Sequence, residues 1–157
     1  GLLPIPFRWV MKASLRKVPF MGKACQMAGF IFVDDQKKGS IKETMDSARR
    51  VLSEGTSIFI FPEGRRTLTG RMDRFKKGGF VLAYELDVPI IPISIDGSYR
   101  ALRAGGRWVT PTRLTLTIHP PIQIDREGEF PRNMLQALDQ VRSSIASVLP
   151  EEQETHS

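Results

Sequence analysis

The segment 63–77 concentrates charged residues of the kind that bind phosphate. An apolar run at 58–61 breaks at Pro62 and is followed by Glu-Gly-Arg-Arg. Six lysines and arginines lie between residues 65 and 77, where Asp73 is the one acidic residue. Phosphate suits arginine because the planar guanidinium donates two parallel hydrogen bonds to a pair of oxygens. The pattern therefore predicts an anion site, and an ordinary solvated basic loop is the alternative.

This charged segment is expected at the edge of a sheet. Five short strand candidates alternate with helix candidates, which predicts an α/β fold: a single domain with a mixed, largely parallel sheet of about five or more strands, flanked by helices. The strands are expected at 8–12, 30–34, 57–61, 90–95 and 113–119. Ligands of such folds bind beyond the ends of the strands, so the turn after the third strand is a natural site. The last strand alternates apolar and polar residues and is expected at an edge.

Helix signals are clearest in three segments. These segments are 41–54, 77–86 and 132–149. Ser40 and Glu43 form a capping box ahead of the first helix, and Gly55 supplies its left-handed end. The last helix is expected to bury one apolar stripe. That stripe consists of Leu135, Leu138, Val141, Ile145 and Leu149.

Composition is that of an ordinary globular domain with an anionic partner. The chain of 157 residues is 41% hydrophobic and 25% charged, which suits one domain, expected at 1–150 with a disordered polar tail at 151–157. No apolar run is long enough to cross a bilayer. The formal charge of +6 favours either nucleic acid or an anionic lipid surface. The sequence has no helix-turn-helix, zinc-finger or RNA-binding signature, which argues against nucleic acid.

The cysteine and histidine content argues against several kinds of site. Cys25 is the only cysteine, so no disulfide can form within the chain and a structural zinc site is not expected. It lies among apolar residues and is predicted to be a small buried side chain. His119, followed by two prolines, is interpreted as structural, and His156 is next to the last residue. We expect neither a metal nor a cofactor.

Four motifs follow one another along the chain. They are "AGFIFVDD" at 28–35, "IFPEGRR" at 60–66, "RFKKGGF" at 74–80 and "VPIIPISIDG" at 88–97. Together and in this order they resemble the motifs of the 1-acylglycerol-3-phosphate acyltransferases, a family of lysophospholipid acyltransferases. The resemblance covers roughly residues 8–125 and implies the glycerolipid acyltransferase fold.

The resemblance also implies a reaction and a set of site residues. The family transfers an acyl group from acyl-CoA or acyl-carrier protein to the free hydroxyl of lysophosphatidate, giving phosphatidate in phospholipid biosynthesis. The substrate-binding residues that it implies are Glu63, Gly64, Arg65, Arg66, Lys76 and Lys12. Arg66 would bind the acceptor phosphate, and Arg65, where the family usually has threonine, would add a contact or point away. Glu63 is expected to orient an arginine, because a free carboxylate would repel phosphate.

The chain departs from the family pattern in two further places. The family's catalytic histidine and aspartate, separated by four residues and upstream of these motifs, are absent from these 157 residues. We therefore expect an amino-terminal truncation of a longer enzyme, with no catalytic residue in this chain. Asp35 stands where arginine is usual, which would weaken phosphate binding by repulsion. The alternative is that Asp35 only begins the polar turn before the next helix.

These observations together favour an enzyme of phospholipid synthesis. It is expected on the cytoplasmic face of a membrane, peripheral or anchored by an upstream segment, with an anionic membrane surface and no nucleic acid as partner. One alternative is a non-catalytic anionic-lipid-binding domain of the same fold, and another is a basic nucleic-acid-binding domain. The segment 18–29, rich in Met and Phe, is interpreted as a plain core helix, with an acyl-chain groove as the alternative.

Overall fold

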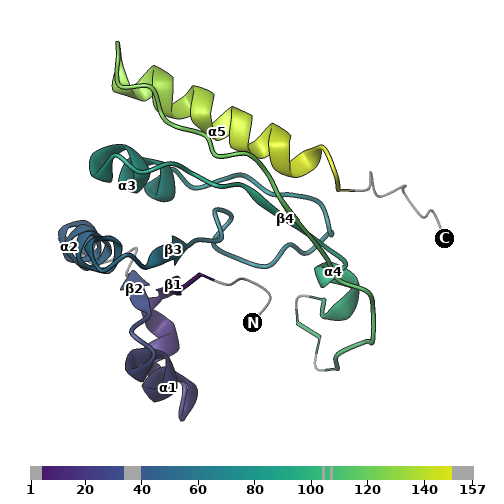
Figure 1. The fold of residues 1–157 in the computed structure, drawn as a ribbon. Helices are drawn as coiled ribbons and strands as arrows, with labels where there is room; N and C mark the ends of the chain where they lie inside the picture. The colour runs from purple at the N-terminus through teal and green to yellow at the C-terminus, as the bar shows by residue number, and fades with distance from the viewer. Residues whose placement is uncertain (1–4, 34–39, 104, 107, 150–157) are drawn as a thin grey trace. The chain divides into compact units, whose positions relative to one another are not determined.

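The computed structural model describes residues 5–33, 40–103, 105–106 and 108–149. These residues divide into two compact units, one ending at Phe61 and the other beginning at Pro62 (Figure 1). The predicted α/β class is confirmed, since each unit combines helices with paired strands. The domain expected at 1–150 stays a prediction, and the tail at 151–157 lies outside the described residues. Within the described part of the chain, no helix is both long and apolar enough to span a bilayer.

The first unit is built on a three-stranded parallel sheet. β1 (Phe7–Lys12) lies in the middle, between β2 (Ile31–Val33) and β3 (Ser57–Phe59). In the register of the sheet, Val10 lies opposite Ile31 and Trp9 lies opposite Phe59. The rings of Trp9 and Phe59 are 4.4 Å apart, so the pairing of β1 with β3 is reinforced by aromatic contact.

Helical segments provide the crossovers that parallel strands need. The 3-10 helix η1 (Ala13–Lys17) and α1 (Met21–Met27) connect β1 to β2, and α2 (Ser40–Ser53) precedes β3. Gly55, at φ +72°, follows α2 in the left-handed conformation that the sequence predicts. The side chain of Ser40, and with it the predicted capping box, lies outside the described residues, as does Asp35.

The second unit packs helices against an antiparallel pair of strands. β4 (Ile93–Asp96) pairs with β5 (Thr115–Ile118), and the short helix α4 (Ser98–Ala101) lies between them in sequence. α3 (Gly78–Leu86) and α5 (Phe130–Ala146) lie side by side (Figure 1) and share one hydrophobic core. The buried members of this core are Phe75, Phe80, Ala83, Ile124, Met134, Ala137 and Val141.

The five expected strands all form, but they group differently from the single sheet that the sequence predicts. Three of them make the parallel sheet of the first unit, and the other two make the antiparallel pair of the second. The antiparallel direction of β5 has a physical reason, because the connection from β4 to β5 turns the chain back alongside β4 and no crossover is needed.

α5 buries part of the expected stripe, since Val141 is buried and Leu138 and Ile145 pack against the core. Met134, Ala137 and Val141 are its buried apolar residues, whereas Leu135 is 43% exposed. The helix begins at Phe130, and the spacing of three and four residues from there selects this face. Leu135 is therefore about 100° around the helix from Met134, and its predicted place in the core is wrong.

Candidate anion-binding site

The basic segment forms one long loop between β3 and α3. Residues 62–77 contain no helix or strand, and the second unit begins with them. The two ends of the loop are joined, because the backbone N–H of Lys76 donates to the carbonyl of Pro62 at 2.8 Å. Because its two ends are hydrogen-bonded to each other, the loop holds the side chains between them in more defined positions than an open loop would.

Gly64 brings the start of this loop against its end. The residue has φ +68°, a conformation that glycine adopts without strain. A Cβ atom at Gly64 would lie 3.0 Å from Cε of Lys76, so the lysine stem crosses the glycine backbone. Two of the predicted site residues, Gly64 and Lys76, are therefore in contact.

Glu63 braces the loop. Its Oε2 atom accepts a hydrogen bond from the backbone N–H of Asp73 at 2.9 Å, so Glu63 ties one side of the loop to the other. Arg65 is oriented by Asp73, whose Oδ2 accepts from Arg65 Nε at 3.0 Å and also from Arg65 Nη2. That Glu63 orients an arginine stays a prediction.

Asp73 is held in its ionised form by this arrangement. The backbone N–H of Arg74, 2.7 Å from Oδ1, lowers the pKa of Asp73 most, and the hydrogen bond and charge of Arg65 lower it further. Desolvation by burial acts in the opposite direction, and the charge of Arg142 makes the smallest contribution, which again lowers the pKa. Arg65 is thus fixed in place by its neighbour, and Asp73 offsets part of its positive charge.

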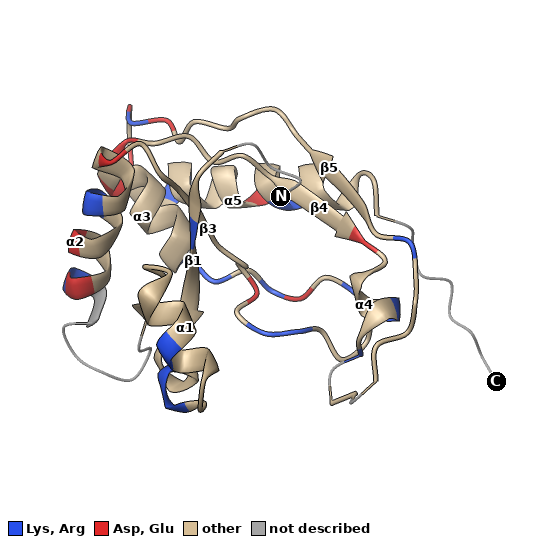
Figure 2. Cartoon of the chain, turned by 60° about the horizontal axis from the view of Figure 1, so that its bottom comes forward, with Lys and Arg blue, Asp and Glu red and all other residues tan. Residues whose placement is uncertain are grey.

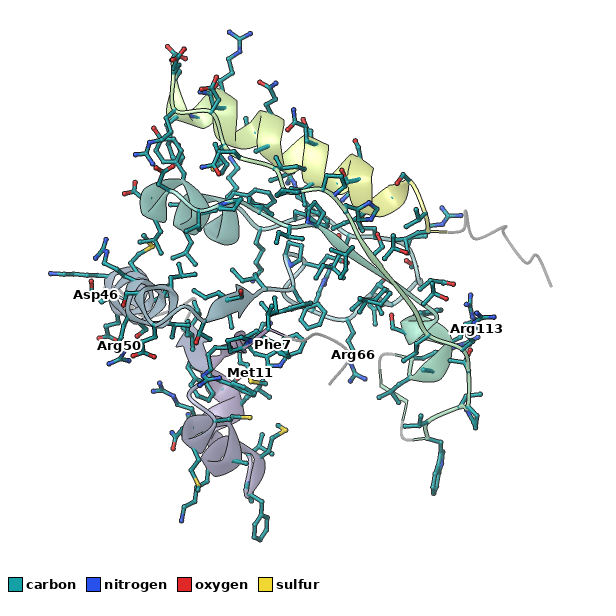
Figure 3. All side chains as sticks on the ribbon, viewed as in Figure 1. Phe7, Met11, Asp46, Arg50, Arg66 and Arg113 are labelled. Atoms are coloured by element: carbon teal, nitrogen blue, oxygen red, sulfur yellow. The ribbon has the colours of Figure 1, made fainter. Side chains whose placement is uncertain are left out.

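Arg66 is an arginine of this loop that is available for a ligand. Its side chain is exposed, and among the described residues no hydrogen bond or ion pair involves its guanidinium. In Figure 3 it points away from α5, out from the loop that carries it. Lys12, the last residue of β1, is exposed and belongs to the first unit. Its part in the site stays a prediction.

Arg142 is a site-shaping residue that sequence reasoning missed. From α5 it donates to the backbone carbonyls of Asp73 at 2.6 Å and Met72 at 3.2 Å. Its guanidinium carbon also lies 5.4 Å from the ring centre of Phe75. Arg142 therefore holds the far side of the loop against the core of the second unit. No sequence signal could have found it, because its partners are 69 and 70 residues away.

His119 and Cys25, which are interpreted as structural from the sequence, are both held within the fold. His119 Nε2 and Ser94 Oγ are 2.8 Å apart, and Ser94 donates to the carbonyl of Ile145 at 2.9 Å. Because the single hydroxyl proton of Ser94 goes to that carbonyl, His119 Nε2 is the donor in the first bond. Cys25 is buried at 8% exposure, as predicted.

Comparison with known protein families assigns the chain to one of them. The family model described as Acyltransferase matches residues 2–96, which include the whole of the loop at 62–77. The match extends over more than half of the chain, so the chain belongs to this acyltransferase family, and the resemblance of its motifs is confirmed.

Individual relatives have names more specific than that of the family model. The chain is 35% identical over 145 residues to 1-acyl-sn-glycerol-3-phosphate acyltransferase alpha of Mus musculus, which covers 90% of this chain and 50% of the mouse protein. It is 34% identical over 125 residues to the 1-acyl-sn-glycerol-3-phosphate acyltransferase of Limnanthes douglasii, covering 79% and 44% respectively. The chain thus spans about half the length of the curated relatives that it matches.

A solved structure supports the fold. The crystal structure of the 1-acyl-sn-glycerophosphate acyltransferase PlsC from Thermotoga maritima matches with a TM-score of 0.69, over 96% of this chain and 59% of that chain. Sequence identity in this match is 24%, so the likeness is one of fold.

Proposed function

We propose that this chain is the acceptor-binding part of an enzyme that acylates 1-acylglycerol-3-phosphate to phosphatidate, with acyl-CoA or acyl-carrier protein as donor. The observation that carries the proposal is the closed loop at 62–77. There Asp73 fixes Arg65, and Arg66 stays exposed and unpaired among the described residues. The activity named for the mouse and Limnanthes relatives supports the same substrate.

The chemistry divides between binding and proton transfer. The acceptor oxygen forms an ester bond to the acyl carbon, and the bond from that carbon to the thioester sulfur breaks. The hydroxyl proton passes to a base, and the released sulfur takes up a proton and leaves as the free thiol. In the resembled family that base is a histidine positioned by an aspartate, and neither is found at that spacing here. The loop at 62–77 contributes charge-assisted hydrogen bonds to the acceptor phosphate. Those bonds hold the hydroxyl in one place, which by itself accelerates a two-substrate reaction.

The site of action that we propose is the cytoplasmic face of a membrane, because the acceptor and the product are both lipids. An anionic bilayer surface would also attract a chain with a formal charge of +6. Peripheral binding and anchoring by a segment upstream of this sequence are both compatible with this location.

Acceptor binding by the 157-residue chain tests the proposal. Calorimetry with a short-chain lysophosphatidate should show binding that the corresponding monoacylglycerol, which lacks the phosphate, does not show. Arg66→Ala should weaken this binding by about ten- to a hundred-fold, because hydrogen bonds to a charged group contribute about 1.5–3 kcal/mol. Arg66→Lys should restore only part of it, since an ammonium cannot make the bidentate contact.

The matched control is Arg50→Ala, which removes one exposed arginine from α2 and leaves the loop unchanged. Equal affinities of wild type and Arg66→Ala for lysophosphatidate would contradict the proposed site. Tight, steeply salt-dependent binding of duplex DNA, with no preference for the phosphate lipid, would favour the nucleic-acid alternative instead.

A further inference from the structure

The turn between η1 and α1 exposes a group of large apolar side chains. Phe20 is 93% exposed, with Val18 at 39% and Met21 at 41%. We call these three residues the α1 tip. Only Gly22 and Cys25 of α1 are buried, so the prediction of a plain core helix at 18–29 is wrong. An exposed apolar group of this kind marks a surface that meets another apolar phase.

The backbone holds Phe20 outward. Its φ of 62° and ψ of −52° form a tight γ-turn, in which the N–H of Met21 donates to the carbonyl of Pro19 at 2.7 Å. A bulky side chain is rare in this conformation, which costs conformational energy wherever it occurs. In this conformation the phenyl ring is 93% exposed.

The turn is also rigidly built. A Cβ atom at Gly22 would lie 2.2 Å from the carbonyl oxygen of Arg16, so η1 and α1 touch backbone to backbone. The N–H of Gly22 donates to the carbonyl of Val18 at 2.9 Å. The side chain of Cys25 is buried beneath. The α1 tip is therefore displayed by a packed corner rather than by a loose loop.

Positive charge surrounds the α1 tip without any acidic residue. Lys17 and Lys23 are both exposed, and no aspartate or glutamate occurs between residues 5 and 33. Arg16 is nearby, with its guanidinium 4.5 Å over the ring of Phe32. Figure 2 shows this contrast, because η1 and α1 carry blue segments only, while α2 carries both blue and red.

We propose that the α1 tip inserts among the headgroups of an anionic lipid bilayer, with Phe20 and Met21 in the acyl boundary and the two lysines at the phosphates. Aromatic and aliphatic side chains flanked by lysine are the composition of interfacial anchors. A second copy of this chain is the less suitable occupant, because Lys17 and Lys23 of one copy would face the same charges of the other. The inference goes beyond the proposed reaction by naming where the protein meets the membrane.

Vesicle co-sedimentation of the 157-residue chain tests the insertion, and it needs neither catalysis nor acceptor binding. The chain should bind vesicles of phosphatidylcholine with phosphatidylglycerol far better than phosphatidylcholine alone. Phe20→Asn should weaken that binding about ten-fold or more, because it removes the most exposed ring and keeps a residue suited to a turn. The matched control is Leu135→Asn, which removes an exposed apolar side chain from α5.

A second vesicle experiment tests the role of the two lysines by comparing two double variants of equal net charge. Lys17→Gln with Lys23→Gln should weaken binding to the anionic vesicles about ten- to thirty-fold at low salt. Lys42→Gln with Arg50→Gln, on α2 of the same unit, should have a much smaller effect, because those cations lie away from the α1 tip.

Three outcomes would overturn the inference. One is wild-type affinity of the Phe20→Asn variant for anionic vesicles. Another is an equal loss of affinity from Leu135→Asn, which would make binding a property of general hydrophobicity. The third is a self-associated wild-type chain that Phe20→Asn converts to monomer without changing vesicle binding, which would assign the α1 tip to a second copy. The lysophosphatidate titrations are separate, so the proposed function can stand if this inference fails.

Discussion

Replacing Arg142 by methionine should loosen the loop at 62–77 while leaving its own sequence intact. Arg142 reaches from α5 to two consecutive loop carbonyls, and its guanidinium lies over Phe75. Methionine keeps much of the aliphatic length and can still contact the ring, but it donates no hydrogen bond. The carbonyls of Met72 and Asp73 would then lose their donor, and the segment that presents Arg65 would be less restrained.

The magnitude follows from the contacts. A hydrogen bond from a charged donor contributes about 1.5–3 kcal/mol, and a cation over an aromatic ring contributes about 0.5–1 kcal/mol at an exposed site. The bond to Asp73 is short at 2.6 Å, whereas the bond to Met72 is long at 3.2 Å. Counting one strong bond and the cation–ring contact, we expect Arg142→Met to lower the free energy of unfolding by about 2–4 kcal/mol.

Urea unfolding and amide hydrogen exchange measure this effect. The amides of Asp73 and Lys76, which close the loop, should exchange faster in the variant. Arg132→Met is the matched control, because Arg132 is an exposed arginine of the same helix, and its replacement should change stability by less than about 0.5 kcal/mol. An Arg142→Met variant as stable as this control, with unchanged exchange at Asp73, would refute the reasoning.

Three other predictions concern the loop and the reaction. Gly64→Ala should destabilise the protein by about 1 kcal/mol or more in urea unfolding, because residue 64 has φ +68° and the added methyl group would press on Lys76. Gly78→Ala is the control, because its methyl group would lie in open space at the start of α3, and it should be neutral or stabilising. Equal effects of the two variants would contradict the argument. The folded-state pKa of Asp73 is lowered, so ionised Asp73 stabilises the folded state fully above its unfolded pKa of about 3.9. That stabilisation is lost as pH falls through the lower folded pKa. Asp73→Asn should therefore flatten the acid side of a plot of unfolding free energy against pH, and an unchanged plot would contradict this. The 157 residues alone should show little or no thiol release from acyl-CoA with lysophosphatidate, since general base catalysis contributes about 10²–10⁴-fold; robust turnover would require a base within this chain.

The regular elements were largely predictable because their signals are local. Strand candidates, the helix after Ser40 and its glycine stop depend on residues within one or two turns of one another, and the structure has them within a few residues. The grouping of the strands into sheets was not predictable, because the direction of β5 depends on the path of the long connection before it. Leu135 was misplaced in the α5 stripe because the helix starts at Phe130, and the face that is buried from there includes Met134 rather than Leu135.

The candidate site was likewise predictable in part. Residue types alone pointed to the segment 63–77 as basic and suited to phosphate, and the motif resemblance pointed to Arg66. Composition and spacing could not decide which cation is already paired. That depends on Asp73 and Glu63 facing particular partners across the loop.

The sequence by itself determined the acyltransferase motifs, the charge that favours an anionic partner and the elements of an α/β fold. These follow from residue identity and short-range periodicity. Only the tertiary structure decided that Asp73 fixes Arg65, that Arg142 supports the loop from α5, and that the apolar residues of the α1 tip face solvent. Each of these depends on contacts, or on their absence, between backbone segments whose approach is set by folding. The physical reason is that burial and hydrogen-bond pairing are properties of neighbours in space, while a sequence orders only neighbours along the chain.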